Sequence, residues 1–480
     1  MKRCRLFAAA LMAAALAGCM TVGPDYKRPQ SDMPDQWPGA TAADPVSATW
    51  WNTYNDPVLD RLVDEALLQN FDLRLAIARV AEARAGLGIA RADQYPGVTA
   101  NANAARNRAS QNSLLGIPSG TDPEFSSYRA TLNAAYEIDF WGKYRRATEA
   151  ARAELLGSQF NRDAVRLTLV TDVARSYFSL RALDAQVEVT RRTISSRLAS
   201  TALTRKRFDA GVASEFDLKQ SEAEAAQAQA LLPTIESQLA QQETALAVLI
   251  GRSPRDIVTK PVDRGTAIEA LTAPPQVPSG LPSDMLERRP DIRAAEQSLV
   301  AANARIGQAK AAYYPSISLT GVFGVESNAL GDLFKAPSRV WQLSASAAQT
   351  VFDAGRTGSQ VAAAEAREQQ VLAQYQSSIQ RAFKDALDAL VIQRKARESL
   401  DAETVRRDAL KSSLDLAQLR YDNGISSLLE VLIAERALLD AELNRVEAQR
   451  AQLSATADLF KALGGGWTPE GNGEKAAKAN

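Results

Sequence analysis

The chain has 480 residues with 56 basic and 56 acidic side chains, so its formal net charge is zero and nothing in this balance points to a nucleic-acid partner. It has no histidine, which removes the commonest general base and metal ligand, and its only cysteines, Cys4 and Cys19, lie near the N-terminus, so no disulfide framework or cysteine metal site can form in the body of the chain. No constellation of a nucleophile and a base stands out, and we do not expect an enzyme.

The first 18 residues predict a secretory signal peptide. Lys2, Arg3 and Arg5 form a basic head, and the apolar run that follows is too short to span a membrane as a helix. The run ends in Leu-Ala-Gly-Cys at Cys19, the pattern of a bacterial lipobox, in which the cysteine becomes the first mature residue and carries the lipid. An ordinary signal peptide with an incidental cysteine is the alternative. We therefore expect a lipoprotein signal peptide over 1–18 and a covalent lipid on Cys19, with no other cofactor.

Residues 19–56 are rich in Pro, Trp, Asp and Ser, and they predict a lipid-anchored, extended arm that lies over the outside of the body. Asp56 and the proline after it open the first helix, because aspartate is a good N-cap and proline fits the first helical turn. Helical patterning continues from Val58 to about Gln94 and stops before the next proline.

Four segments alternate polar and apolar residues with a period of two, which is typical of strands and not of helices. They lie at about 97–108, 127–140, 316–326 and 340–352. Their lengths and alternation suit a membrane barrel, in which apolar side chains face lipid and polar side chains face the interior. The aromatic residues that would form girdles at the membrane interfaces are Tyr128, Tyr136, Phe140, Trp141, Trp341 and Phe352. The alternative is two soluble β-hairpins.

Four strands are too few to close a barrel, since the smallest membrane barrels have about eight. An open sheet edge in lipid would leave backbone groups without hydrogen bonds, at a cost on the order of several kcal/mol each. Strands that span the membrane would therefore have to be completed by neighbouring chains. Strands that span the membrane therefore require an oligomer, and hydrogen bonding alone leaves the number of copies open.

The chain carries one long unit twice. Three glycines recur 213 positions later, in the pairs Gly142 and Gly355, Gly211 and Gly424, and Gly251 and Gly464. A spacing that stays unchanged over so long a stretch argues against loops, which tolerate insertions, and favours helices packed along their whole length. Each copy is therefore expected to be a rigid helical hairpin, over 142–251 and over 355–464.

The long helices that lead to the hairpin tips are predicted over Lys143–Lys206 and Arg356–Leu419, neither with a proline and each with a single glycine. Helices of this length extend roughly 95 Å and must lie side by side, as in a coiled coil or a tube. The return helices are expected at Ala213–Ile250 and Ser426–Leu463. Pro233 should interrupt and kink the first of them.

Each hairpin turns at an Arg-aromatic-Asp-x-Gly motif. The residues we single out at the tips are Arg207, Asp209 and Gly211 in the first copy and Arg420, Asp422 and Gly424 in the second. Glycine supplies the left-handed backbone of a tight turn, and arginine in a last helical turn complements the helix dipole. This structural role accounts for the motif by itself, and docking of a partner at the tips is the other interpretation.

Together these features resemble the TolC-like outer membrane efflux family, in its lipoprotein branch, which is often called NodT-type. Besides the lipobox and the tip motifs, the resemblance is carried by Gly23-Pro24-Asp25-Tyr26, Trp50-Trp51, Asp139-Phe140-Trp141-Gly142-Lys143, Leu286-Glu287-Arg288-Arg289-Pro290-Asp291-Ile292 and Phe352-Asp353-Ala354-Gly355-Arg356. The match covers essentially the whole mature chain, in the family's order.

The resemblance implies a mainly α protein with membrane β-structure, built from a duplicated unit. Three copies would form a homotrimer. Each copy would contribute four strands to one twelve-stranded β-barrel, and the long periplasmic hairpins of the three copies would form an α-barrel. The implied divisions are a first repeat over 57–251, an equatorial linker over 252–285, a second repeat over 286–464 and a C-terminal tail over 465–480.

The resemblance also implies the outer membrane channel of a tripartite efflux system, lipid-anchored and extending into the periplasm, that passively conducts drugs or other small solutes to the exterior. Its partners would be a periplasmic adaptor (membrane fusion) protein, an inner-membrane pump of the resistance-nodulation-division type and outer membrane lipid. The tips would contact the adaptor, and the gate region would comprise Phe216, Gln220, Leu429, Ile433 and Arg436. Ile433 stands where relatives can have an acid, which argues against an acidic ring at this level.

The main alternative is a lipid-anchored periplasmic coiled-coil protein, structural or an adaptor, without a pore. Adaptors also have long hairpins, but they lack paired strands of membrane length. The sequence names neither the exported solute nor the partner pump.

Overall fold

The computed structural model describes residues 21–30, 32–34, 47–110, 122–274 and 285–465. The predicted signal peptide, Cys19 and nearly all of the predicted C-terminal tail lie outside these residues. The chain divides into two compact units. One comprises Met1–Gln30, Val80–Ser158 and Ala295–Tyr375, and the other comprises Ser31–Arg79, Gln159–Ala294 and Gln376–Asn480.

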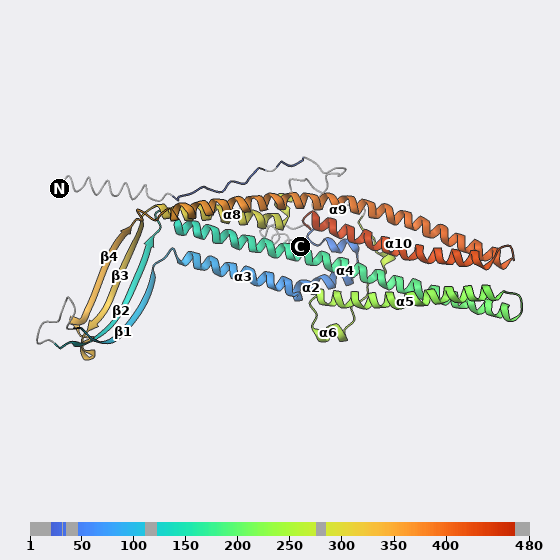
Figure 1. The fold of residues 1–480 in the computed structure, drawn as a ribbon, viewed down its shortest axis with the longest axis horizontal. Coiled ribbons are helices and arrows are strands. Elements are labelled where there is room, and N and C mark those ends of the chain that lie inside the picture. Colours follow the sequence, from blue (N-terminus) through green and yellow to red (C-terminus); the bar gives the residue numbers. More distant parts are fainter. Residues whose placement is uncertain (1–20, 31, 35–46, 111–121, 275–284, 466–480) are drawn as a thin grey trace, which may run out of the picture. The chain divides into compact units, whose positions relative to one another are not determined.

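The first unit contains a four-stranded antiparallel sheet in the order β1-β2-β3-β4 (Figure 1). The strands are β1 Gly97–Arg108, β2 Glu124–Ile138, β3 Ser316–Ser327 and β4 Arg339–Ala348. The first repeat supplies β1 and β2, the second supplies β3 and β4, and the two halves join where β2 pairs with β3. Within the described sheet, β1 and β4 therefore each have a neighbour on one side only.

Two of the predicted strands extend beyond the point where the strands of the structure end. β2 begins earlier than predicted and ends at Ile138, because Asp139 accepts the backbone N–H of Arg145 at 2.8 Å and so belongs to the start of the next helix. β4 ends at Ala348, because Asp353 accepts two backbone N–H groups of the following helix at 2.9 and 2.8 Å. In both places a side-chain cap on the next helix takes over from the strand ladder.

The pairing register places most of the large apolar residues of the four strands on one face of the sheet. Leu132 pairs with Phe323, and Phe323 pairs with Trp341, so three large side chains form a row across β2, β3 and β4. The neighbouring residues Thr131 and Asn133 point to the opposite face, because successive side chains of a strand alternate. The alternation of apolar and polar side chains that was predicted for each strand is thus in register from one strand to the next.

Two helical hairpins of equal length form most of the helical part of the chain (Figure 1). The long helices α4 Lys143–Asp209 and α9 Arg356–Asp422 have 67 residues each, and the return helices α5 Glu215–Leu249 and α10 Leu428–Ala462 have 35 each. The helices α9 and α10 begin and end 213 positions after α4 and α5, the same spacing as the repeated glycines, which confirms the duplication. Within the described residues no helix is long and apolar enough to cross a membrane.

The predicted interruption at Pro233 is wrong, because α5 continues through this residue. A proline inside a helix removes one backbone hydrogen bond and crowds the preceding turn. The remaining hydrogen bonds on both sides of Pro233 hold the helix together across this defect.

The helical stretch predicted for 58–94 is in fact two helices, α2 Pro57–Gln69 and α3 Phe71–Ala92. Asn70 separates them, because its backbone is extended with ψ 131°. Its side chain accepts the backbone N–H of Leu73 at 2.9 Å and so starts the second helix. A single capping residue within a continuous helical pattern made this break hard to predict.

The core of the second unit gathers the aromatic residues of the N-terminal arm. Trp50, Trp51 and Tyr54 are buried in the short helix η1 Trp50–Tyr54, and the Trp50 ring stacks on Phe460 of α10 with ring centroids 5.0 Å apart. The prediction that residues 19–56 lie over the outside is therefore wrong for this end of the arm. Large aromatic rings gain more free energy from burial than an extended surface path allows.

Asp56 caps α2 as predicted and is also held from two other segments. Its carboxylate accepts the backbone N–H of Val58 at 2.9 Å, the Tyr177 hydroxyl at 2.6 Å and the backbone N–H of Thr266 at 3.1 Å. Burial and the hydrogen bond to Asp56 raise the pKa of Tyr177. This buried cap joins the start of the first repeat to α4 and to the linker between the repeats.

Shorter elements complete the described chain. The linker contains α6 Pro254–Thr259 and η2 Ile268–Ala270, and the second repeat opens with α7 Met285–Arg288, α8 Pro290–Lys310 and η4 Ala311–Tyr313. The helices η5 Leu330–Asp332 and η6 Ala336–Ser338 lie between β3 and β4. Ile268 and Leu271 of the linker are buried in the core of the second unit.

Candidate functional site

The first hairpin turns through a Schellman motif at its tip. The backbone N–H of Gly211 donates to the carbonyl of Phe208 at 2.8 Å, and the N–H of Val212 donates to the carbonyl of Arg207 at 2.8 Å. Gly211 has φ +74°, a left-handed conformation that glycine adopts without a steric penalty. Two carbonyls at the end of α4 are thereby satisfied within the turn.

The second tip repeats this turn. The N–H of Gly424 donates to the carbonyl of Tyr421 at 3.0 Å, the N–H of Ile425 donates to the carbonyl of Arg420 at 2.8 Å, and Gly424 has φ +71°. Arg207 and Arg420 both lie in the last turn of their helices, where their charge complements the helix dipole.

The caps of the return helices differ between the two tips. In α5 the Ser214 hydroxyl accepts the backbone N–H of Asp217 at 3.1 Å, and the Asp217 carboxylate accepts the N–H of Ser214 at 3.3 Å, a complete capping box. In α10 the equivalent Ser427 makes no side-chain cap within the described residues. Glu430, which has the position of Asp217, instead lies 3.8 Å from Arg420. The second tip therefore has the weaker helix start.

One contact joins the two tips. The Arg207 guanidinium lies over the ring of Tyr421, 5.2 Å from its centroid, in a cation–π arrangement between α4 and α9. Asp209 and Asp422 are exposed at the ends of the same helices. The tip motifs of the two copies thus lie together, while their acidic residues remain open to solvent.

The tips expose large apolar side chains. Val212 and Ile425, the residues after the two turn glycines, are 78% and 70% exposed. Of the predicted gate residues, Phe216, Leu429 and Ile433 are also exposed, whereas Gln220 is half-buried. A group of exposed apolar residues on otherwise polar helices is typical of an interaction surface.

The predicted gate residues form one stripe on each return helix. Phe216 and Gln220 are four residues apart on α5, and Leu429, Ile433 and Arg436 follow one another at spacings of four and three on α10. Residues at these spacings share one face of a helix.

Behind the tips, four charged residues from three helices meet. We call them the charge cluster: Arg197 of α4, Glu224 of α5, and Glu435 and Arg436 of α10. Arg436 forms an ion pair with Glu224, and an Arg197 guanidinium nitrogen lies 3.3 Å from a Glu224 carboxylate oxygen. Arg197 also donates to the Glu224 backbone carbonyl at 2.7 Å and lies 3.9 Å from Glu435.

Three members of the cluster are largely buried, whereas the Arg436 side chain is 53% exposed, and the hydrogen bonding of these three members is incomplete. The side chains of Arg197 and Glu224 are 2% and 6% exposed. Among the described residues, Nε and Nη2 of Arg197 and one oxygen each of Glu224 and Glu435 have no hydrogen-bond partner. Burial lowers the pKa of Arg197 against the opposing pull of Glu435, and burial raises the pKa of Glu435 although Arg197 opposes it.

Sequence reasoning found Arg436 and missed the other three members of the cluster. One signal could have revealed Arg197 and Glu224, because each is a charged residue whose counterpart in the other copy is uncharged, whereas Glu435 corresponds to Glu222 and gives no such signal. At the repeat spacing, Arg197 corresponds to Leu410 and Glu224 corresponds to Ala437. Arg436 in turn corresponds to Ala223.

The six predicted interfacial aromatics fall toward both ends of the sheet. Tyr136 lies near the end of β2 that leads into α4, with Phe140 and Trp141 just beyond it and Phe352 just beyond β4 at the same end, whereas Tyr128 and Trp341 lie toward the other end. The Trp141 ring is fixed by stacking on Tyr314 at 4.6 Å between centroids and by its indole N–H, which donates to the Pro315 carbonyl at 2.8 Å.

The beginning of the N-terminal arm is docked in the first unit. Arg28 donates to both carboxylate oxygens of Glu296 in α8 at 2.6 and 2.8 Å, and Tyr26 donates to the same group at 3.2 Å. Arg146 of α4 donates to Asp25 at 2.8 Å. The arm therefore joins a helix of the first repeat to a helix of the second within this unit.

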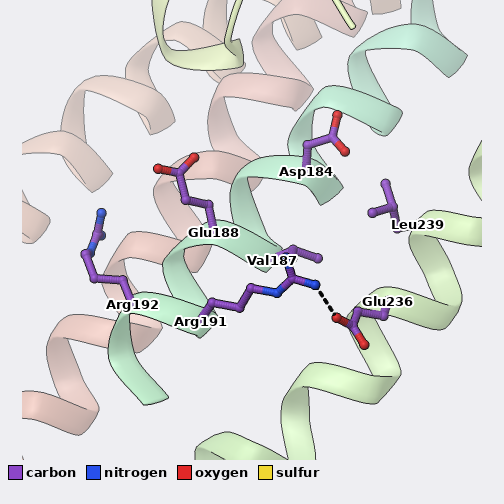
Figure 2. Close-up of a pocket in the computed structure, with 7 residues that line it drawn as sticks. All are labelled: Asp184, Val187, Glu188, Arg191, Arg192, Glu236 and Leu239. Carbon is purple, nitrogen blue, oxygen red and sulfur yellow. Dashed lines mark hydrogen bonds and ion pairs between the residues drawn. The ribbon is translucent and has the colours of Figure 1, made fainter. Parts of the chain in front are cut away.

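A cavity of about 460 Å³ lies between α4 and α5. Figure 2 shows its lining residues, Asp184, Val187, Glu188, Arg191, Arg192, Glu236 and Leu239. Arg191 reaches across it to Glu236 at 2.7 Å, and Asp184 is paired with Arg181 at 2.6 Å. Within the part of the chain that the structure describes, no group of three His, Cys, Asp or Glu residues is arranged to hold a metal ion. We assign no ligand to this cavity.

Comparison with known proteins gives a consistent result. A family model described as outer membrane efflux protein matches residues 62–252 and 281–465. The solvent efflux pump outer membrane protein SrpC of Pseudomonas putida is 35% identical over 470 residues, which cover 95% of this chain and 97% of that protein. The probable outer membrane lipoprotein SilC of Salmonella typhimurium is 34% identical over 458 residues, 94% and 96% of the two chains. The crystal structure of the Campylobacter jejuni CmeC outer membrane channel matches with a TM-score of 0.89 and 25% identity, over 95% and 98% of the chains.

The paired long hairpins and the one-sided apolar sheet thus define a channel-type outer membrane protein with an α-barrel and a β-barrel part. The chain belongs to the family of outer membrane efflux proteins. It is an outer membrane component of an efflux system, and its family is one of transport proteins. The alternative expectation of a periplasmic coiled-coil protein without a pore is therefore wrong.

Proposed function

We propose that three copies of this chain form one continuous conduit from the periplasm to the exterior. The observation that carries the proposal is the described four-stranded sheet, which has one apolar face and two edge strands with a single neighbour each. Because strand directions alternate, β4 of one copy can pair with β1 of the next copy in the antiparallel sense. Three copies then close a twelve-stranded barrel that leaves no backbone edge in lipid.

In this proposal the hairpins of the three copies form the periplasmic tube, and their tips receive a periplasmic adaptor protein. The exposed Val212 and Ile425 and the gate residues Phe216, Leu429 and Ile433 support this role, because they leave apolar surface uncovered at the tips. An inner-membrane pump of the resistance-nodulation-division type delivers drugs or other small solutes, which the conduit passes on without doing work on them. The tips stay closed until the adaptor contacts them.

A covalent lipid on Cys19 anchors the chain in the outer membrane in this proposal. The described arm begins two residues later at Thr21, which packs against Gly142 so closely that a Cβ there would lie 2.6 Å from the threonine methyl group. The contacts of Asp25, Tyr26 and Arg28 then hold the arm. The anchor is thus joined to a firmly held segment.

The test is electrophoresis and conductance of the full-length protein purified from outer membranes. We expect an unheated band at three times the mass of one chain that collapses on heating, and stepwise conductance when the protein is added to a planar bilayer. A monomer that forms no conducting steps, with or without the adaptor, would contradict the proposal.

A second measurement addresses the partner. Cysteines introduced at the exposed positions 212 and 425 should crosslink to a co-expressed periplasmic adaptor, whereas a cysteine at the exposed Val258 of α6 should not. Crosslinking at position 258 alone would place the docking surface elsewhere.

A further inference from the structure

We infer that the apolar face of the sheet carries a binding site for the phosphate groups of lipopolysaccharide, the glycolipid of the outer leaflet. The site consists of Arg106 and Arg108 of β1 and Arg339 of β4, which we call the basic patch. The inference rests on the proposed function, in which the end of the sheet away from the long helices faces the exterior. We call this end the outer end.

The strand register places the basic patch on the face that also carries Leu132 and Trp341. Arg106 and Arg108 pair with even-numbered residues of β2, the set to which Leu132 belongs. Arg339 precedes Trp341 by two positions on β4 and therefore shares its face. The last residues of β1 and the first residues of β4 both lie at the outer end (Figure 1).

Charge on this face is confined to the outer end. The basic patch supplies the only charged residues of β1 and β4, and on the same face of β2 and β3 only Glu124, the first residue of β2, is charged. Three arginines and one glutamate leave this end of the face with a net charge of +2 per chain. A charge that faces lipid is costly near the midplane and tolerated near the interface, where lipid phosphates lie.

The basic patch is only partly neutralised within the chain. Arg106 and Arg108 share the carboxylate of Glu124 at 2.9 and 3.2 Å, and their side chains remain 76% and 72% exposed. Arg339 is exposed and has no ion pair among the described residues. Because each guanidinium has five N–H donors, the patch keeps many donors free for an outside anion.

The other acidic residues at the outer end are engaged elsewhere in the described structure. Glu326 lies 3.8 Å from Arg129 on the opposite face of the sheet. Asp122 accepts the backbone N–H of the first residue of β2 at 2.9 Å, and Asp332 pairs with Lys335 in the connection between β3 and β4. The basic patch therefore needs a counter-ion from outside the chain.

The surroundings of the basic patch favour a lipid over a free anion. Guanidinium groups present paired N–H donors that match phosphate oxygens. The patch continues directly into the apolar row of Leu132, Phe323 and Trp341, and Trp341 is 78% exposed. A lipid that places its phosphates at the arginines can lay its acyl chains along this row. In the outer leaflet that lipid is lipopolysaccharide, because its lipid A part carries phosphate groups above several acyl chains.

Two copies of the chain contribute to each site. Within one copy β2 and β3 separate Arg339 from Arg106 and Arg108. In the proposed barrel β4 of one copy pairs with β1 of the next, so the two parts of the basic patch come together at each boundary between copies. A lipid bound there bridges two copies and stabilises the oligomer, because it binds the assembled state alone.

The experiment measures binding of lipid A in detergent micelles to the full-length trimer after its native lipid has been removed. We expect bisphosphorylated lipid A to bind on the order of tenfold more tightly than dephosphorylated lipid A or phosphatidylglycerol, because charge-assisted hydrogen bonds to its phosphates are lost in the first and fewer in the second. Arg339→Gln and the double variant Arg106→Gln/Arg108→Gln should each remove this preference. Glu124→Gln should strengthen binding, because it frees two arginines.

Arg129→Gln is the matched control, because Arg129 lies on the opposite face of the same sheet and is paired with Glu326. It should bind lipid A as the wild type does. Equal binding of phosphorylated and dephosphorylated lipid A, equal binding of phosphatidylglycerol, or an equal loss in Arg129→Gln would overturn the inference. Charges that served only to protect the edge strands from aggregation would produce the first of these results.

A second readout separates this inference from the proposed function. Bisphosphorylated lipid A should raise the temperature at which the wild-type trimer dissociates, and it should not raise that of Arg339→Gln. A wild-type trimer that conducts in planar bilayers but gains no thermal stability from lipid A would overturn the inference and leave the proposed function standing. A wild-type chain that stays monomeric and does not conduct would contradict the proposed function, and with it the two-copy site.

Discussion

After the long helices and after the return helices of both hairpins, a glycine adopts a conformation that is costly for most other residues. Gly211, Gly251, Gly424 and Gly464 have φ between +71° and +91°. At the two tips an added Cβ would meet no atom within 4 Å, so the backbone conformation alone selects glycine there. At Gly251 a Cβ would also lie 2.5 Å from the carbonyl of Gln69, so close packing adds a second requirement.

The left-handed backbone at the tip glycines predicts how much stability a substitution there would cost. Gly424→Val should destabilise the protein by about 1–2 kcal/mol, because a β-branched residue is strained in the left-handed region. It should also impair efflux if the tip docks a partner. Gly424→Asn should cost less, and Gly88→Ala inside α3, where a Cβ meets open space, should not destabilise at all. Thermal melting by circular dichroism checks this, and equal melting of Gly424→Val and the wild type would refute it.

A second residue-scale prediction concerns pH. Glu243 of α5 accepts two guanidinium N–H groups of Arg264 at 2.8 and 2.9 Å and the backbone N–H of Val262 at 2.7 Å, and the hydrogen bonds from Arg264 hold its pKa below the usual 4.5. Because the folded pKa lies below the unfolded one, the stabilisation is present above about pH 4.5 and is lost as pH falls through the folded value.

Glu243→Gln should therefore lower the stability at pH 7 by about 1–2 kcal/mol, and the difference from the wild type should shrink toward zero in acid. Glu236→Gln on the same helix is the control, because its pair with Arg191 is exposed and should contribute little at any pH. Melting curves from pH 3 to pH 7 measure both. A deficit of Glu243→Gln that persists unchanged at pH 3 would show that charge is not its cause.

At the scale of elements, the sheet shows how alternation and register act together. The alternation within each strand sets which residues can share a face, and the pairing of β2 with β3 and of β3 with β4 decides which of them become neighbours. The row of Leu132, Phe323 and Trp341 exists only because all three strands are in register. A shift of β2 by one residue would place the polar Thr131 or Asn133 in that row in place of Leu132.

We expect Leu132→Arg to disrupt assembly and Asn133→Arg to be tolerated, although the two positions are adjacent. A charge on the lipid-facing side of a membrane strand costs about 2–4 kcal/mol near the midplane, whereas the opposite face is polar. The amount of heat-modifiable oligomer in outer membranes measures the effect. Equal losses in the two variants would show that the apolar face does not meet lipid.

At the scale of the whole molecule, we propose that the chain is a lipid-anchored subunit that functions only in copies. Cys19→Ala should abolish incorporation of labelled fatty acid into the protein, because the cysteine thiol is the proposed acceptor. Cys4→Ala, which changes the other cysteine of the chain and lies in the signal, should leave incorporation intact. Labelled palmitate followed by electrophoresis distinguishes the two. Labelling that survives in Cys19→Ala would exclude the lipobox interpretation.

The sequence by itself determined the duplication, the two long hairpins, the tip turns and the four strands, because each follows from a signal confined to a few residues or from a constant spacing. Gly211 and Gly424 report a turn, Asp56 reports a helix start, and alternation reports a strand, wherever these segments lie in the fold. Only the tertiary structure decided the burial of Trp50 against Phe460 and the charge cluster around Arg197. These features depend on which surfaces meet, and the free energy of burying a ring or a charge is set by partners far away in the chain.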